Sequence, residues 1–107
     1  MRLPARLAIL PLLLFPVCAL AATVQVQIMG MNFHPDTVTV APGTTVTWTN
    51  DDSFGHTTTS DTTSDTTLWD SGLLAPGKSY SHIFDTPGNY PYHCAVHTFM
   101  TGTVTVK

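Results

Sequence analysis

Short runs in which apolar and polar residues alternate make up most of the chain after residue 22. Val24, Val26 and Ile28 alternate with two glutamines, and the same period of two recurs over residues 37–40, 45–49, 80–84, 90–94 and 103–106. A period of two puts one set of side chains on each face of a β-strand. Each run has an apolar and a polar face, which is typical of antiparallel strands buried on one side. The sequence therefore predicts an all-β protein.

Three proline–glycine pairs mark turns between these runs. They lie at Ala41-Pro-Gly43, Ala75-Pro-Gly77 and Thr86-Pro-Gly88, where proline presets φ and glycine permits a positive φ. Seven or eight short strands with such punctuation predict a sandwich of two sheets. Pro91 removes a donor from its strand, so we expect a sheet edge or an interruption there. The Thr-Thr-Ser-Asp quasi-repeat over residues 58–67 is expected to be a solvated excursion between strands.

The first 21 residues have the pattern of a secretory signal. Arg2 and Arg6 supply positive charge, residues 7–17 are mostly aliphatic, and Ala19-Leu-Ala21 is a small-x-small cleavage site. The aliphatic stretch is shorter than the about 20 residues that a membrane-spanning helix needs. We therefore expect residues 1–21 to be removed, which leaves residues 22–107 as one periplasmic or secreted domain.

Removal of this segment changes the chemistry of the chain. Cys18 leaves with it, so Cys94 is the remaining thiol and no intramolecular disulfide is possible. The remaining chain contains two lysines and seven acidic residues, so its formal charge is −5. A nucleic-acid partner would require clustered basic residues and is not expected, whereas the charge suits a basic protein partner. A domain of this size has a small core and gains stability from a bound metal.

The residues best suited to bind a metal are grouped near the C-terminus. Cys94, His97 and Met100 lie within seven residues, and His56 lies in a separate turn-prone segment upstream. One thiolate, two imidazoles and a weak axial thioether are the ligand set of a mononuclear electron-transfer copper site. Neither a helix nor a strand would point the side chains at 94, 97 and 100 toward one place. The strand must therefore end near Cys94, and the chain must then loop around one point.

Three other histidines are weaker candidates for metal ligands. His93 adjoins Cys94 on a strand and must point to the opposite face, so we expect it at the surface or behind the ligands. His82 is expected to be a partly buried, hydrogen-bonded strand residue, and His34 to be solvated in a turn. Zinc in place of copper is disfavoured, because a thioether is a poor zinc ligand.

These motifs resemble those of the cupredoxins, in particular the plastocyanin and amicyanin group, from about Val24 to Lys107. The similar segments are Met31-Asn-Phe-His-Pro35, Val46-Thr-Trp-Thr-Asn50, Gly55-His-Thr57, Gly88-Asn-Tyr-Pro-Tyr-His-Cys94 and the residues from His97 to Gly102. The Cys-x-x-His-x-x-Met spacing resembles the short loop of the amicyanins. The resemblance implies a Greek-key β-sandwich that holds one copper ion, with His56, Cys94 and His97 as equatorial ligands and Met100 as the axial ligand.

Two positions depart from the pattern of this family. Val96 stands where many relatives have proline, and Thr57 stands where many have an asparagine that ties the two ligand loops together. A hydroxyl has a shorter reach than an amide, so a less constrained loop is expected. The dry shell of the copper site is expected to come from six aromatic side chains, namely Phe33, Trp48, Phe54, Tyr90, Tyr92 and Phe99.

The resemblance implies that the protein shuttles single electrons, with His97 as the electron port and with Phe99 and Phe54 near it. The expected partners of this monomer are redox proteins, such as a c-type cytochrome or an exported dehydrogenase or oxidase; the mature domain is not expected to insert into a membrane. A copper carrier that delivers the ion to an exported oxidase would use the same ligands and is the alternative. Enzyme activity is not expected, because copper oxidases and nitrite reductases need a second copper centre with added histidines, and position 95 is alanine.

Overall fold

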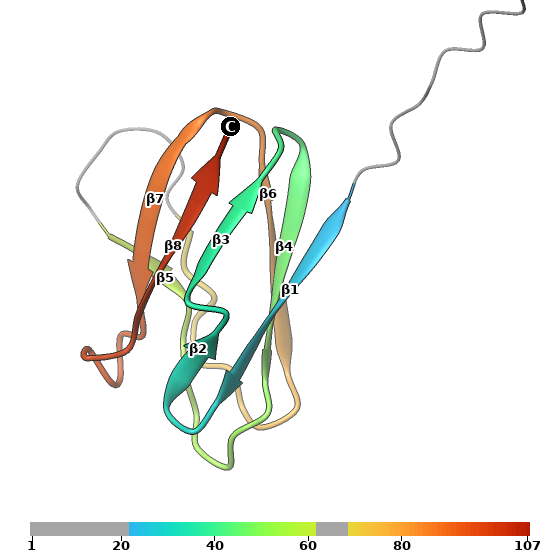
Figure 1. Ribbon diagram of the computed structural model, residues 1–107. Coiled ribbons are helices and arrows are strands. Elements are labelled where there is room, and N and C mark those ends of the chain that lie inside the picture. Colours follow the sequence, from blue (N-terminus) through green and yellow to red (C-terminus); the bar gives the residue numbers. More distant parts are fainter. Residues whose placement is uncertain (1–21, 62–68) are drawn as a thin grey trace, which may run out of the picture.

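Eight strands make up the secondary structure of residues 22–61 and 69–107, the part of the chain that the computed structural model describes (Figure 1). One sheet contains β1 (Thr23–Met29), β2 (Asn32–His34), β4 (Thr44–Asn50) and β6 (Ser79–Phe84), in the order β2-β1-β4-β6. The other contains β3 (Thr37–Val40), β5 (Thr59–Ser60), β7 (Gly88–His93) and β8 (Thr101–Val106), in the order β3-β8-β7-β5. The two sheets face each other, which confirms the expected all-β sandwich. Among the described residues there is no helix long and apolar enough to cross a membrane.

Two of the expected features lie outside the described residues. One is the signal segment, residues 1–21, and the other is residues 62–67 of the Thr-Thr-Ser-Asp quasi-repeat. The first residues of the repeat are described, and for them the expectation of a solvated excursion is wrong, because Thr59–Ser60 form β5 and Thr58 and Ser60 are buried.

The direction of two strand pairs differs from the expectation. β1 pairs with β4 and β3 pairs with β8 in parallel, whereas the other ladders are antiparallel. The expectation of antiparallel strands throughout is therefore wrong for these two pairs. The physical reason is that alternation reports which side of a strand is buried, and carries no information on the direction of its neighbour.

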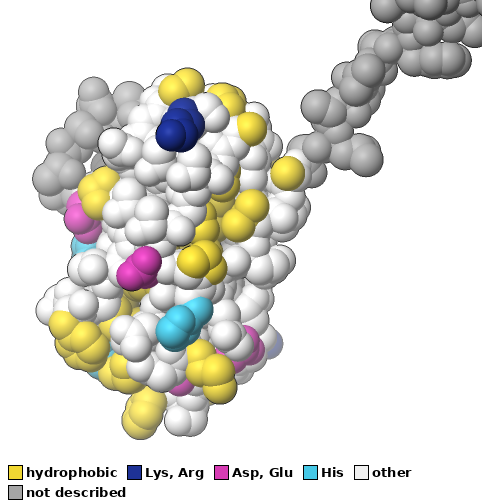
Figure 2. All heavy atoms as spheres, viewed as in Figure 1, with side chains coloured by type: hydrophobic (Ala, Val, Ile, Leu, Met, Phe, Trp, Pro, Cys, Tyr) yellow, Lys and Arg dark blue, Asp and Glu magenta, His cyan; other side chains and the backbone are white. Residues whose placement is uncertain are grey.

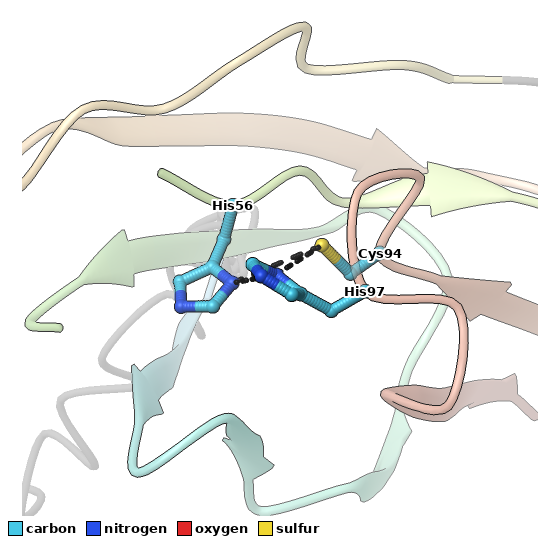
Figure 3. Close-up of side chains that lie close together, drawn as sticks. All are labelled: His56, Cys94 and His97. Carbon is cyan, nitrogen blue, oxygen red and sulfur yellow. Dashed lines mark hydrogen bonds between the residues drawn. The ribbon is translucent and has the colours of Figure 1, made fainter. Parts of the chain in front are cut away.

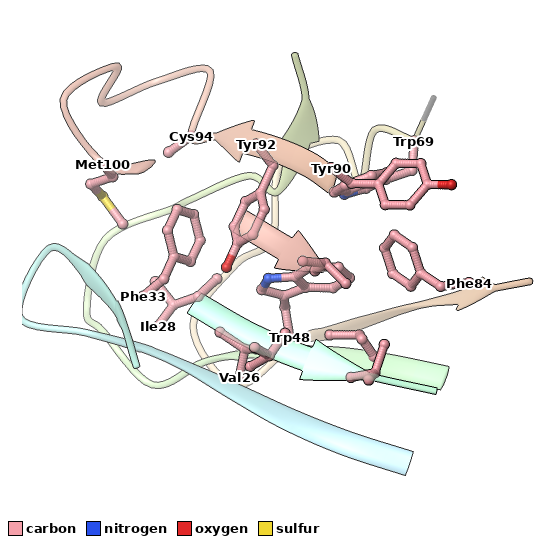
Figure 4. Packing of buried hydrophobic residues seen from close by; sticks show 14 of the residues in the cluster. Val26, Ile28, Phe33, Trp48, Trp69, Phe84, Tyr90, Tyr92, Cys94 and Met100 are labelled. Atoms are coloured by element: carbon pink, nitrogen blue, oxygen red, sulfur yellow. The ribbon is translucent and has the colours of Figure 1, made fainter. Parts of the chain in front are cut away.

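The predicted faces of the strands are confirmed by burial. In β4 the even positions from Thr44 to Asn50 are buried, and the odd positions between them are partly exposed. The inward side chains of both sheets form one core between the layers (Figure 4). Its buried apolar members are Val26, Ile28, Phe33, Val38, Val40, Val46, Trp48, Trp69, Leu74, Phe84, Tyr90, Tyr92, Cys94, Met100, Val104 and Val106.

Aromatic rings occupy the centre of this core. Trp48 stacks on Trp69 with ring centroids 5.7 Å apart and meets the edge of Tyr92 at 5.4 Å. Tyr92 in turn packs against Phe33 at 4.8 Å. Burial raises the pKa of Tyr92 to about 12, so its phenol is neutral at physiological pH. Tyr92 lies two residues before Cys94 on the same face of β7. The rings therefore connect the two sheets at the end of the sandwich where β7 ends.

Two of the predicted turns have the geometry that their sequence demands. The N–H of Thr44 donates to the carbonyl of Ala41, at 3.2 Å, and Gly43 has a φ of 89°. The turn that begins at Ala75 repeats this arrangement, with a φ of 82° at Gly77. Proline followed by a glycine with φ near +80° is the signature of a type II turn.

Pro91 lies in an interior strand rather than at an interruption. β7 continues through it and pairs with β8 on one side. On the other side β5 covers only Tyr92 and His93, and the carbonyl of Pro91 accepts the N–H of Asp61 at 2.9 Å. The backbone N–H that Pro91 lacks would lie beyond the end of β5. Pro91 is therefore at the edge of the ladder between β5 and β7, although β7 itself lies inside the sheet.

We predict that Gly102→Ala destabilises the sandwich. A Cβ at this position would lie 2.3 Å from Cζ of Tyr92, whose ring is buried and held by neighbouring aromatic rings. Overpacking of this kind costs about 1–3 kcal/mol. Urea unfolding would measure the loss, with Thr101→Ala on the same strand as an exposed control. Equal stability of the two variants would contradict this description of the core.

Candidate metal centre

A closed loop of seven residues connects β7 to β8. β7 ends at His93 and β8 begins at Thr101. Across the loop, the N–H of Cys94 donates to the carbonyl of Met100 at 3.1 Å, and the N–H of Met100 donates to the carbonyl of His97 at 2.9 Å. The chain therefore loops around one point after Cys94, as its sequence predicts.

A second loop, residues 51–56, comes from the opposite sheet and is organised by Asn50. The side chain of Asn50 is fully buried at the end of β4, where its Nδ2 donates to the carbonyls of Phe54 and Leu74 at 2.7 and 2.8 Å. Its Oδ1 accepts the N–H of Asp52 at 3.0 Å. His56 then exchanges two backbone hydrogen bonds with Leu74, at 2.7 and 3.1 Å. Five polar contacts thus determine where the His56 side chain can lie.

The two loops bring three possible metal ligands together (Figure 3). Nδ1 of His56 lies 3.8 Å from Sγ of Cys94, Nδ1 of His97 lies 3.9 Å from the same sulfur, and the two nitrogens are 3.2 Å apart. His56 and Cys94 are buried, whereas His97 is partly exposed. The dashed lines in Figure 3 mark these contacts between the three side chains.

The size of this triangle suits a metal ion. A circle through the three atoms has a radius of about 2.1 Å, and metal bonds to imidazole nitrogen and thiolate sulfur are about 2.0–2.3 Å long. One ion could therefore contact all three atoms without movement of the backbone. Two imidazoles and one thiolate in a plane are the donors of a trigonal copper site.

Met100 lies at the end of the same loop, on the side of the core. It is 2% exposed, and its carbonyl accepts the N–H of Cys94. Met100, Cys94 and Phe33 belong to the same buried cluster, and Figure 4 draws Met100 and Cys94 at one end of it. A thioether there is placed to be a further, weak ligand of an ion held by the triangle.

Asp52 contacts the nitrogen of His56 that does not face Cys94 and His97. Its Oδ2 lies 2.9 Å from Nε2 of His56. A carboxylate accepts the proton of Nε2 and leaves the lone pair of Nδ1 directed toward the other two ligands. Hydrogen bonds lower the pKa of Asp52, first that from the N–H of Met31 and then those from Gly30 and His56, although burial acts in the opposite direction.

Residues 20–107 match the family described as copper binding proteins, plastocyanin/azurin family. The chain belongs to this family. It is 39% identical to the plastocyanin of Scenedesmus fuscus over 84 residues, which are 70% of this chain and 86% of that protein. It is 33% identical to amicyanin-alpha of Methylorubrum extorquens over 88 residues, which are 81% of this chain and 74% of that protein.

The fold of this cupredoxin also occurs within a larger copper protein. It resembles part of a copper-containing nitrite reductase from Thermus scotoductus, with a TM-score of 0.74 and 29% identity. The match covers 82% of this chain and 22% of that one.

Thr57 joins the two ligand loops of this cupredoxin in spite of its short side chain. Its hydroxyl accepts the N–H of Ala95 at 2.7 Å, and its own N–H donates to Sγ of Cys94 at 3.3 Å. The expectation that threonine leaves the loops less constrained is therefore wrong for this contact. β5 begins two residues after Thr57 and pairs with the end of β7, so the two backbones lie close enough for a hydroxyl to reach.

The remaining histidines lie outside the triangle. His93 points away from Cys94, as expected, and its Nδ1 lies 2.5 Å from Oδ1 of Asp61. His34 is exposed, as expected, but it is the last residue of β2 rather than part of a turn, and its Nε2 lies 3.1 Å from the carbonyl of Met29. His82 is partly buried and stacks on Trp69 at 5.4 Å, as a strand residue of the core face should. Within the described residues its buried Nε2 has no hydrogen-bond partner, so that part of the expectation is wrong.

Four of the six aromatic side chains expected in the shell of the site, Phe33, Trp48, Tyr90 and Tyr92, are buried in the core. Phe54 and Phe99 are 61% and 71% exposed, so their assignment to the shell is wrong. Both lie in the loops that carry the ligands, where the sandwich ends and no layer covers them.

Sequence reasoning overlooked Asn50 and Asp52, which it treated only as turn formers. A signal for Asn50 was available. It follows Val46 and Trp48 on the core face, and a polar side chain at such a position must find partners when buried. Asp52 lies four residues before His56, a spacing that brings two side chains together in a helix. Residues 51–55 have no regular structure, so this spacing alone could not predict the contact.

We predict that Thr57→Val frees the 94–100 loop of this cupredoxin. Valine has the same shape but cannot accept the N–H of Ala95, and such a hydrogen bond contributes about 0.5–1.5 kcal/mol. Amide hydrogen exchange at Ala95 should accelerate, by up to about tenfold for 1.4 kcal/mol. Thr57→Ser, which keeps the hydroxyl, is the matched control. Unchanged exchange in the valine variant would contradict the proposed link between the loops.

Proposed function

We propose that this chain is an exported type 1 copper protein that carries single electrons between redox proteins. In this proposal His56, Cys94 and His97 are the equatorial ligands and Met100 is the axial ligand. The observation that carries it is the triangle of two imidazole nitrogens and one sulfur, whose sides are 3.2, 3.8 and 3.9 Å. Membership of a copper-binding family supports copper as the ion.

Copper bound at this triangle would supply the one-electron couple between Cu(II) and Cu(I). The contribution of the protein is to keep the ligand atoms where they are in both states. Asn50 holds the His56 loop, two backbone hydrogen bonds close the 94–100 loop, and Thr57 connects the two. The N–H of Thr57 also donates to Cys94 Sγ, which stabilises negative charge on the sulfur. Small changes in structure between the two states favour fast electron transfer.

The proposed route for electrons is the exposed edge of His97. His97 is the ligand of the triangle that is not fully buried. Four exposed apolar side chains come from the same end of the sandwich, and we call them the apolar rim: Phe54, Leu73, Val96 and Phe99. The ring centroids of Phe99 and His97 are 6.2 Å apart, and a Cβ placed on Gly55, beside His56, would lie 2.8 Å from Cδ1 of Leu73. In Figure 2 apolar side chains gather at this end, at the lower edge of the view.

An exposed apolar patch of this kind favours brief docking of another protein. We propose a redox protein as the partner, such as a c-type cytochrome or an exported dehydrogenase or oxidase. A formal charge of −5 for residues 22–107 supports a partner with a basic surface, since charge complementarity raises association rates. Export is proposed because residues 1–21 have the composition of a cleavable signal.

A copper carrier would use the same four ligands. Burial of His56 and Cys94 favours the electron carrier, because an ion behind buried ligands exchanges slowly with an acceptor. Measurement of electron self-exchange in the presence of a Cu(I) chelator distinguishes the two functions. Rapid self-exchange with full retention of copper would support electron transfer as the function. Rapid loss of copper to the chelator would support copper delivery.

We predict that one equivalent of Cu(II) produces an intense visible absorption band from copper–thiolate bonding. Cys94→Ala should abolish the band, because it removes the sulfur of the triangle. His93→Ala is the matched control, since His93 adjoins Cys94 and points toward Asp61 instead. A colourless wild-type protein, or a band that survives in Cys94→Ala, would contradict the proposed ligands.

We predict that Phe99→Ala slows electron transfer to a basic c-type cytochrome by about tenfold, the effect of losing about 1.4 kcal/mol of docking energy. Ile83→Ala is the control, because Ile83 is 56% exposed on β6 and pairs with Thr45, toward the opposite end of the sandwich. Stopped-flow kinetics would measure both variants. Equal rates for the two would exclude the apolar rim as the docking surface.

A further inference from the structure

The carboxylate of Asp52 joins three groups from two parts of the chain. Its Oδ1 accepts the N–H of Gly30 at 2.8 Å, and its Oδ2 accepts the N–H of Met31 at 3.0 Å. The same Oδ2 lies 2.9 Å from Nε2 of His56. The side chain of Asp52 is 13% exposed, so these partners replace most of its water.

The turn between β1 and β2 is built to present its amides to this carboxylate. Gly30 and Met31 have φ values of 61° and 60°. Two successive residues in the left-handed region form a tight hairpin turn, and a non-glycine residue rarely adopts this conformation. The hydrogen bond to Met31 helps to stabilise it. A turn from the first hairpin is thereby connected to a proposed copper ligand through one side chain.

We infer that Asp52 is a positioning residue that sets the tautomer and orientation of His56 and tunes the reduction potential of the site. The inference concerning the potential rests on the proposed function. Acceptance of Nε2–H leaves Nδ1 as the only nitrogen with a free lone pair, and Nδ1 is the atom that faces Cys94 and His97. A purely structural role in the β1–β2 turn would require the contacts to Gly30 and Met31 but not the contact to His56.

The sign of the effect on the potential follows from charge. A carboxylate that accepts a proton from an imidazole makes the other nitrogen a stronger donor. It also places a negative charge on the side of the His56 ring that faces away from the ion. Both effects favour the more highly charged Cu(II) state over Cu(I), so Asp52 lowers the reduction potential.

Asp52→Asn and Asp51→Asn form a matched pair of variants. Both remove one negative charge from the same loop. In Asp52→Asn a single uncharged oxygen replaces two carboxylate oxygens that serve three N–H groups, so the hydrogen bond that holds the proton on Nε2 of His56 is weakened or lost. Asp51 accepts a hydrogen bond from Nε2 of Gln27 at 3.0 Å, so its replacement leaves the His56 contact intact.

The first measurement is 15N NMR of the histidine rings in the metal-free protein. We expect the Nε2–H tautomer of His56 in the wild type and in Asp51→Asn, and a shift toward Nδ1–H in Asp52→Asn. This readout requires no copper. A switch of tautomer therefore supports the positioning role even if the wild-type protein forms no coloured copper site. An Nδ1–H tautomer in the wild type overturns the inference, and this holds even if Asp52→Asn does not fold.

The second measurement uses the copper-loaded proteins. We expect Asp52→Asn to bind Cu(II) about 10–100-fold more weakly than Asp51→Asn, the usual loss when a partner of a metal-bound histidine is removed. Its reduction potential should also rise more than that of Asp51→Asn. Equal affinity and equal potential in the two variants would show that only charge matters and would overturn the inference.

Discussion

The metal centre depends on contact between two loops that come from opposite sheets. Residues 51–56 follow β4 in one sheet, and residues 94–100 join β7 to β8 in the other. Thr57 connects them, with one hydrogen bond to the backbone of Ala95 and one to the sulfur of Cys94. The sandwich holds both loops in position, because Tyr92 and Trp48 pack between the sheets directly beneath them. The ligand geometry is thus a consequence of how the two sheets pack.

Polar groups near this centre are fully or largely shielded from water, and their mutual hydrogen bonds offset the cost of removing them from it. Asn50 uses both ends of its amide, and Asp52 accepts three hydrogen bonds. A buried polar group with no partner costs about 1–3 kcal/mol, so the loop cannot relax without loss of stability. Rigidity at the site therefore comes from satisfied polar groups, whereas the remainder of the core is held by apolar packing.

The sequence contained most of the information on the ligands and less on what supports them. The residues Cys94, His97 and Met100 lie close together in the chain, so their donor chemistry and spacing were sufficient to predict a loop around one point.

The buried faces of the strands followed from alternation. The parallel pairing of β1 with β4 did not, because it depends on how the chain crosses between sheets. The contacts of Asp52 with Gly30 and Met31 span more than 20 residues, and no local pattern encodes such a distance. Phe54 and Phe99 were assigned to the interior because they are aromatic, although their loops lie where the layers end.

X-ray absorption spectroscopy at the copper edge tests the central claim most directly, that two Nδ1 atoms and one Sγ atom surround a single ion. The spectrum of the copper-loaded protein should contain one short copper–sulfur distance and the scattering pattern of two imidazole rings. A first shell made only of nitrogen and oxygen, or one with a single imidazole, would contradict the account.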